Sequence, residues 1–259
     1  MLYGRKITVD IENVDKVLSY PELEITFNGK MDTDPSPDIF EIRIYNLSNG
    51  RINSIKKDAQ INLNAGYGDD IGLIFTGVIQ RAETITEEAS LITLIKVQTG
   101  NKNWVAGTIS KTYNGQVKAS KILADLIPSL GLEAGYIDLV NDVTYKNGKT
   151  VFGKIKDVVK QIANECDTPI IIKDGKINFI NENTRFQTAY ILKSSTGLIT
   201  SPSKVDDEKA DYQVKCLLNN NLTIKSLIKL ESKYITGNFE VVEALFNDDF
   251  TQELKLKEV

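Results

Sequence analysis

Apolar and polar residues alternate along residues 1–102 of the chain. Alternating runs occur, for example, at residues 7–11 and 40–44. A period of two sends successive side chains to opposite faces of a strand, so each run predicts a strand with one buried face. The predicted strands cover residues 7–11, 23–27, 40–44, 61–65, 73–86 and 91–97.

Turn-forming residues separate these runs. The pair at 28–29 (Asn-Gly) and residues 66–72 predict turns, and residues 32–38, with two prolines and no apolar residue, predict a loop. Gly77 lies within the longest run and predicts a bulge or a sharp bend. Short strands joined by turns are typical of a small antiparallel barrel or sandwich, which we predict for residues 1–102.

After Trp104, apolar residues recur at three and four positions, which is the spacing of a helix. This spacing predicts one helix over residues 119–130, with Gly131 at the position of a C-cap. A second helix is predicted to begin after Thr150, its N-cap, and to end before Pro169. Its apolar stripe comprises Phe152, Ile155, Val158, Val159, Ile162, Ala163 and Cys166.

A hairpin is predicted directly after the second helix. Residues 170–172 and 177–180 are mostly apolar, and the turn at 173–176 contains an Asp-Gly pair, which favours a positive φ. Two helices and a hairpin make a small α/β unit, which we assign to residues 103–192.

The last part of the chain returns to strand patterns. Residues 181–212 are polar and rich in turn residues, and predict a connector with one short strand at 189–192. Four short strands bury little surface on their own, so we expect this last sheet to pack on the first domain, the α/β unit or another subunit. The four predicted strands cover residues 212–218, 222–230, 237–246 and 251–256.

Together these patterns predict an α+β fold that is mostly antiparallel β. A first β-barrel or sandwich domain (1–102) and a second, smaller one (193–259) are separated by the α/β insert (103–192).

The composition excludes several function classes. The 259 residues include no histidine, so Ser-His-Asp, Cys-His and HExxH sites are absent. The net charge is −4 and the lysines are scattered, which argues against sequence-specific nucleic-acid binding. Cys166 and Cys216 have no CxxC spacing, so we predict no metal site, no disulfide framework and no cofactor.

The sequence also argues against stable membrane insertion. Charges at Arg5, Lys6 and Asp10 interrupt any signal-like apolar run, and no later segment approaches the ~20 apolar residues of a membrane span. We expect the chain to be soluble and cytoplasmic when made.

Two kinds of residue could take part in catalysis or sugar binding, and each also has a purely structural explanation. Acidic clusters at 69–70, 87–88, 206–208 and 248–249 could supply the paired carboxylates of a glycosidase, but each lies in a predicted turn, where acids are usually solvated. Tyr67, Trp104 and Tyr113 could stack on sugars, but they are isolated, and core packing explains them equally well. We therefore predict no catalytic residues.

Residues 66–80 read GYGDDIGLIFTGVIQ, a Gly-Tyr turn followed by a strand, and residues 237–254 contain a strand that begins at Gly237 and precedes an acidic turn at 248–249. These segments resemble the first tube-like domain and the closing strands of the second tube-like domain in the baseplate hub proteins of contractile phage tails and of tail-like particles of the defective-prophage or R-type bacteriocin kind. Residues 119–132 and 152–180 are similar to the α/β segment between them.

This resemblance implies a non-catalytic structural hub that is made in the cytoplasm of a bacterial host and located in the baseplate of a virion or tail-like particle. In the family, three subunits form a ring in which two tube-like domains per subunit give six similar units around a lumen. The ring joins the sixfold tail tube to a threefold central spike. The implied partners are other copies of the chain, the tail tube protein, the central spike protein, other baseplate proteins and the tape-measure protein.

Within such a ring we predict that Phe239, Val241 and Phe246 lie at a subunit interface, because a four-stranded sheet has two faces and too few residues to cover both. Two alternatives stay open. One is a tail-tip cell-wall hydrolase that uses carboxylates such as Asp69 and Asp248. The other is a carbohydrate- or receptor-binding β module that uses Trp104 and the tyrosines.

Overall fold

The computed structural model describes residues 4–33, 37–173, 176–181 and 186–259. Most strands in these ranges belong to one 13-stranded sheet, and three smaller sheets contain the others. Apart from β10–β14 and β15–β18, which are parallel, the paired strands are antiparallel. The predicted α+β class with mostly antiparallel β structure is therefore confirmed.

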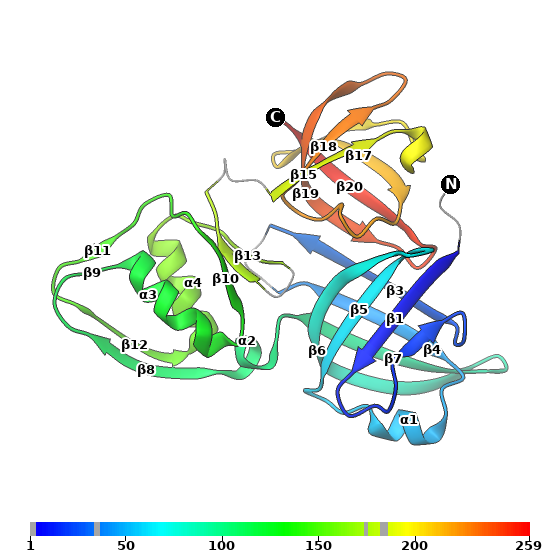
Figure 1. Cartoon of the computed structure of the whole chain (residues 1–259), viewed down its shortest axis with the longest axis horizontal. Helices are drawn as coiled ribbons and strands as arrows, with labels where there is room; N and C mark the ends of the chain where they lie inside the picture. The colour runs from blue at the N-terminus through cyan, green and yellow to red at the C-terminus, as the bar shows by residue number, and fades with distance from the viewer. Residues whose placement is uncertain (1–3, 34–36, 174–175, 182–185) are drawn as a thin grey trace.

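The chain forms three regions, which Figure 1 shows as two stacked β regions with a third region beside them. The N-terminal β region contains β1 to β7, the insert contains α2 to β14, and the C-terminal β region contains β15 to β20.

In the N-terminal β region the strand order is β3-β4-β7-β6-β5-β1-β2. The alternating runs at 7–11 and 40–44 form strands whose apolar side chains are buried, as predicted. The elements are β1 (Arg5–Ile11), β2 (Leu18–Tyr20), β3 (Ile25–Asp32), β4 (Ile39–Tyr45), α1 (Asn49–Ser54), β5 (Gln60–Tyr67), β6 (Asp70–Glu87) and β7 (Ser90–Thr99).

The predicted turn at Asn28–Gly29 is wrong. β3 continues through both residues to Asp32, and Gly29 pairs with Phe40 of β4. A Cβ atom on Gly29 would lie only 2.3 Å from the Phe40 ring. The glycine therefore allows the ring to lie against the backbone within a continuous strand. Residues 34–36 of the predicted loop lie outside the described residues.

Gly77 lies between two irregularities of β6. The register of this strand shifts at Ile74 against β5 and at Gln80 against β7. A Cβ atom on Gly77 would lie 2.3 Å from the side chain of Val97 on β7. The interruption predicted for this run is present, but the bulges fall on either side of the glycine, which itself allows a close approach between strands.

The insert packs helices against small sheets. α3 and η1 cover residues 119–130, and Gly131 follows in the left-handed conformation with φ 66°, as predicted for a C-cap. The elements are α2 (Lys102–Ala106), β8 (Thr108–Tyr113), β9 (Val117–Lys118), α3 (Ala119–Leu126), η1 (Ile127–Leu130), β10 (Glu133–Ile137), β11 (Thr144–Tyr145), β12 (Lys149–Lys154), α4 (Ile155–Glu165), β13 (Ile170–Lys173) and β14 (Lys176–Phe179).

The second helix begins later than predicted. Thr150 lies in β12, which pairs with β8, and α4 starts at Ile155 with Lys154 as its N-cap. Phe152 is consequently 81% exposed instead of lying on the buried stripe. The rest of the stripe is buried, and the predicted hairpin forms as β13 and β14. Its turn residues, 174–175, lie outside the described residues.

Among the described residues, the C-terminal β region contains one strand beyond those predicted. The short strand predicted at 189–192 forms as the end of β15, whereas β16 is an additional strand within the expected connector. β18 begins only at Ser226, after Lys225 in a left-handed conformation. The elements are β15 (Phe186–Leu192), η2 (Ser194–Thr196), β16 (Ser203–Asp207), β17 (Ala210–Leu217), β18 (Ser226–Glu231), β19 (Thr236–Phe246) and β20 (Thr251–Glu258).

Two hydrophobic cores stabilise these regions. The larger core contains side chains from both β regions, and the smaller core lies between the helices and sheets of the insert. The expectation that the last sheet packs on another part of the chain is therefore confirmed, because it shares a core with the N-terminal β region.

Candidate assembly site at the junction of the three regions

Strand β19 connects the two β regions. One edge of β19 pairs with β20; on the other edge, residues 236–240 pair with β18 and residues 243–246 pair with β3. The register against β20 shifts at Val242, between these two sets of partners. The hydrogen-bonded sheet is therefore continuous from one β region to the other (Figure 1).

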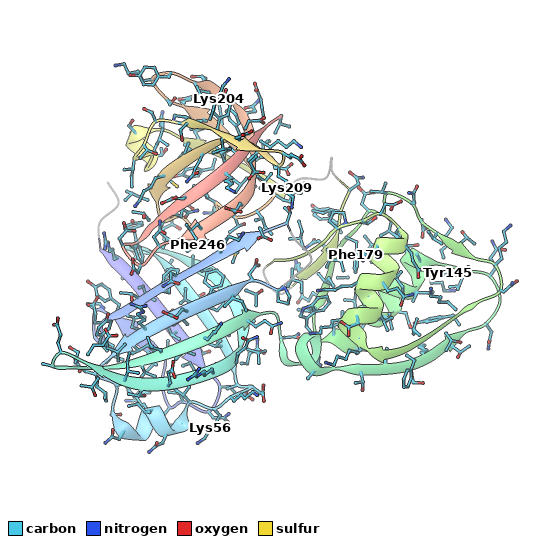
Figure 2. The ribbon with its side chains drawn as sticks, turned by 180° about the vertical axis from the view of Figure 1, so that it is seen from behind. Lys56, Tyr145, Phe179, Lys204, Lys209 and Phe246 are labelled. Atoms are coloured by element: carbon cyan, nitrogen blue, oxygen red, sulfur yellow. The ribbon has the colours of Figure 1, made fainter. Side chains whose placement is uncertain are left out.

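The residues predicted at a subunit interface lie on β19, within the core of the chain itself. Phe239, Val241 and Phe246 are 1%, 0% and 0% exposed. The ring centroid of Phe239 lies 5.6 Å from that of Tyr212, and the centroid of Phe246 lies 5.6 Å from that of Phe40. In Figure 2, Phe246 is labelled where the two β regions meet.

Side chains of the same chain, including those of the N-terminal β region, bury all three residues. A second subunit is therefore not needed to cover this face of the last sheet. Phe239→Asp would place a charge in this core and would therefore disturb folding. A loss of assembly in this variant could not be distinguished from a loss of folding. A contact of these residues with a second subunit stays a prediction.

A second contact joins the β5–β6 turn to the β19–β20 turn. The Tyr67 hydroxyl donates to the backbone oxygen of Phe250 at 3.4 Å, and the two rings meet edge to face with centroids 5.2 Å apart. The Arg5 guanidinium lies 5.4 Å from the centroid of the Phe250 ring. Burial raises the pKa of Tyr67, which keeps its hydroxyl protonated as a donor.

The insert contacts the β regions through the hairpin β13–β14. Ile170, Ile177 and Phe179 belong to the core of the insert, whereas Ile171 and Ile180 belong to the core of the β regions. Figure 2 shows Phe179 beside the helices of the insert. Because the hairpin alternates between two cores, side-chain packing fixes the insert to the rest of the chain.

A buried ion pair lies next to this hairpin. The Nζ atom of Lys225 lies 2.6 Å from Oε1 of Glu240, and the side chains are 10% and 7% exposed. Both residues line a groove of about 390 Å³, together with Pro169 and Ile171 of the insert. Each charge would be costly to bury alone, so the pair holds the segment before β18 against β19.

The acidic clusters considered for catalysis lie in turns or at strand ends. The Asp69 side chain is fully exposed, with Oδ1 3.5 Å from Nζ of Lys6, and Asp248 is also exposed. The contact between Tyr67 and Phe250 brings the turns that carry these two acids to the same end of the molecule.

The pKa of six carboxyl groups in the described residues is lowered. Burial raises the pKa of Asp249, but hydrogen bonds from Thr251 and Lys215 outweigh it. A general acid near neutral pH needs the opposite shift. The groups concerned are Asp125, Asp142, Glu165, Asp207, Glu231 and Asp249.

The aromatic residues considered for sugar stacking are largely covered. Trp104 is buried in the core of the insert, and Tyr67 is buried at the contact with Phe250. Tyr113 is half-buried and donates its hydroxyl proton to the Asp125 carboxylate. The structure does not bring these three rings together as an exposed platform.

Sequence reasoning missed two similar polar clusters on the insert. In the first, the Asp125 carboxylate of α3 accepts from the Tyr113 hydroxyl and, at 2.6 Å, from Nζ of Lys111, both on β8. The lysine also lies 5.4 Å from the centroid of the Tyr113 ring. The cluster attaches a strand to a helix, and no local sequence pattern indicates such a connection.

The second cluster repeats this arrangement on α4. Glu165 accepts from the hydroxyl of Tyr145 and, at 2.9 Å, from Nζ of Lys149 and Nε2 of Gln161. Burial raises the pKa of Glu165, but these hydrogen bonds outweigh it, so the net shift is downward. The ionised carboxylate therefore holds the β11–β12 segment on the helix.

The free edges of the large sheet differ in character. Among the described residues, β2 and β16 end its main path, and β15 ends its branch. β2 has only three residues, and the sequence of β16, SKVDD, is mostly charged. β15 has seven residues and exposes Ile191. Short or charged edge strands resist pairing with another chain. Of these three strands, β15 is therefore the one best suited to pair with a strand of another chain.

The described residues contain no group of three or more His, Cys, Asp or Glu side chains placed to hold a metal ion. No helix in these ranges has the length and apolarity to cross a membrane. Cys166 and Cys216 are buried free thiols; burial raises the pKa of both, that of Cys216 to about 12.

The family model described as baseplate hub gp41 matches residues 6–245. The chain belongs to this baseplate hub family. The match extends over the N-terminal β region, the insert and most of the C-terminal β region, and it confirms the resemblance seen in the sequence. As a family member, the chain is a structural component of the baseplate of a phage tail or tail-like particle. No curated protein matches the chain.

Solved structures of tail proteins share the fold of this hub family member. A tail protein from Neisseria meningitidis MC58 has a TM-score of 0.65 at 10% identity, covering 99% of this chain and 97% of its own. The prophage MuSo2 tail protein from Shewanella oneidensis has a TM-score of 0.63 at 11% identity, covering 98% of both chains.

A third similar structure comes from a secretion system. The E. coli c3393 protein, described as a type VI secretion system component with structural similarity to T4 bacteriophage tail proteins, has a TM-score of 0.67 at 9% identity. The alignment covers 97% of this chain and 76% of c3393. At such identities the likeness establishes the fold alone.

Proposed function

We propose that this hub protein is non-catalytic and joins the tail tube to the central spike of a phage tail or tail-like contractile particle. Family membership supports the location in the baseplate. The observation that carries the proposed role is the pairing of β19 with both β3 and β18, because it links two β regions into one continuous sheet within a single chain.

A chain with two linked β regions suits a symmetry adaptor. Three copies would place six β regions around a lumen, which would match a sixfold tube to a threefold spike. In this proposal, residues 1–102 and 193–259 form two tube-like domains of the ring wall, and β15 is added to the second domain because it pairs with β18. The remaining residues of 103–192 form the insert. The tail tube protein, the spike, other baseplate proteins and the tape-measure protein are the proposed partners.

Contacts between subunits are proposed to involve the free edges of the sheet, with β15 as the first candidate, because it is the longest of the three end strands. Phe239, Val241 and Phe246 would then act on assembly indirectly. Their burial fixes the path of β19, and this path sets the orientation of the two β regions in each subunit.

The proposal is tested with particles produced in the absence of this chain. Electron microscopy should then show tubes and spikes that are not joined, or no complete tails, and supplying the chain in trans should restore them. Intact particles formed without the chain would contradict the proposed role.

A separate assay addresses catalysis. The purified chain should release no fragments from cell-wall substrate, and Asp69→Asn and Asp248→Asn should match the wild type both in this assay and in particle yield. Cell-wall cleavage that either substitution abolishes would contradict the non-catalytic part of the proposal without affecting the structural part.

A further inference from the structure

A cavity lies where the three regions of the chain meet. Its volume is about 40 Å³. The N-terminal β region contributes Met31 and Thr76 to its lining, the insert contributes Leu132 and Ile172, and the segment before β18 contributes Thr223. The cavity is thus lined by parts of the chain that are far apart in the sequence.

Thr223 carries a polar atom that lacks a protein partner. The residue is 5% exposed, and its hydroxyl has no hydrogen-bond partner among the described residues. Its backbone N–H is satisfied, because it donates to Oγ of Ser226 at 3.3 Å. A buried hydroxyl without a partner is destabilising, so native structures generally satisfy such groups with protein atoms or ordered water.

Another buried threonine, Thr168, has a hydroxyl whose hydrogen bonds are satisfied by protein atoms. Oγ1 of Thr168 accepts from the backbone N–H of Val140 at 2.9 Å and donates to the carbonyl oxygen of Cys166 at 2.8 Å. The Thr168 hydroxyl therefore acts both as a hydrogen-bond acceptor and as a donor within the protein. Thr223 differs from it in this respect, and Thr223 also borders a cavity.

Other polar groups of the lining could share a ligand with Thr223. Thr99 and Asp38 also line the cavity, and Oγ1 of Thr99 accepts from the backbone N–H of Asp38 at 3.0 Å. A threonine hydroxyl can accept and donate at the same time, so the Thr99 hydroxyl can still donate a hydrogen bond. Polar groups therefore lie on both the Thr223 side and the N-terminal side.

We propose that this cavity is a binding site for a small cluster of ordered water molecules, anchored by the Thr223 hydroxyl. One water needs about 10–15 Å³ of this volume, so a cavity of about 40 Å³ has room for about three waters. Each buried water needs two to four polar partners, which Thr223, Thr99, Asp38 and the neighbouring waters provide. The cluster would satisfy the Thr223 hydroxyl at the junction of the three regions.

The first test is a crystal structure of the full chain at a resolution that shows ordered waters. The proposal predicts density for a water within hydrogen-bond distance of Oγ1 of Thr223. A cavity without density, or a side-chain rotation that gives this hydroxyl a protein partner, would overturn it.

Thermal unfolding of variants supplies the second test. Thr223→Val keeps the shape of the side chain but removes the hydroxyl, so it should lower the Tm by about 2–4 °C, while Thr223→Ser should retain the water. Thr168→Val is the matched control that must lower the Tm, because it removes hydrogen bonds made within the protein. A Tm of Thr223→Val equal to or above that of the wild type would show that the hydroxyl anchors nothing, and would overturn the proposal.

Discussion

The two β regions and the insert are stabilised by different kinds of interaction. The β regions share one core, and strands that are distant in the sequence, such as β3 and β19, pair within their common sheet. The insert has its own core around α3 and α4, sheets of only two or three strands, and polar clusters that attach strands to helices.

The β regions are stabilised mainly by contacts between residues far apart in the sequence, whereas the insert is stabilised mainly by contacts between residues close in the sequence. Pairing β3 with β19 requires a long loop to close before any contact is gained, whereas the insert forms mostly from contacts within its own residues. The β regions should therefore unfold together, and the insert should show a separate local stability. The hairpin β13–β14 couples the two, because its residues belong to both cores.

The largest effect is expected at the junction of the β regions. Phe246→Ala removes a fully buried ring next to Phe40, and should lower the free energy of unfolding by about 3–5 kcal/mol. Denaturant unfolding followed by circular dichroism measures it. Tyr234→Ala, at a residue that is 71% exposed, is the control and should change stability by less than about 0.5 kcal/mol. Similar losses in the two variants would show that the junction is not a core.

The next effect distinguishes the two faces of β13. Ile171→Ala should cost about 2–4 kcal/mol and raise hydrogen exchange in β19 and in the N-terminal β region. Ile170→Ala, one residue away, should cost a similar amount but raise exchange mainly in α3 and α4. If both variants produce the same exchange pattern, the hairpin does not separate two cores.

A smaller effect is expected from the polar clusters of the insert. Tyr145→Phe removes the hydroxyl that donates to Glu165 and should lower the stability of the insert by about 1 kcal/mol. Tyr113→Phe should act similarly through Asp125. Hydrogen exchange of α3 and α4 measures both losses. Unchanged exchange in both variants would mean that packing alone holds the strands on the helices.

The smallest effect concerns pH. The pKa of Glu165 in the folded chain lies below its ordinary value of 4.5, so this group stabilises the insert above that pH, and the contribution is lost as the pH falls through the lowered pKa. Hydrogen exchange of α4 should therefore rise as the pH decreases below about 4.5, once corrected for the intrinsic pH dependence of exchange. Glu165→Gln should flatten this rise, and an unchanged profile would contradict the assignment.

The sequence predicts local elements well where the pattern is strong. The alternating runs of β1 and β4 and the helix that ends at Gly131 form as expected. The errors arise where a distant partner decides the local structure. The local sequence predicts a turn at Gly29, but the glycine lies in a strand, where it makes room for the Phe40 ring. The local sequence likewise predicts a helix N-cap at Thr150, but this residue lies in β12, which pairs with β8.

The candidate site was less predictable than the fold. Phe239, Val241 and Phe246 are apolar residues on a short sheet, and their pattern cannot show whether another subunit or the same chain covers them. In the structure the same chain buries all three residues. The pairing of β19 with β3 contributes to this burial, and it brings together residues more than two hundred positions apart, such as Lys30 and Glu243. The Lys225–Glu240 pair was missed for the same reason, since a charged residue within a strand pattern usually faces solvent.

The central claim is that this chain forms the ring between tube and spike. A cryo-electron microscopy reconstruction of the assembled baseplate tests it directly. The account predicts three copies of the chain around the tail axis, with N-terminal and C-terminal β regions alternating around one lumen. A chain located away from the axis, or a ring in which only one of its two β regions lines the lumen, would contradict the claim.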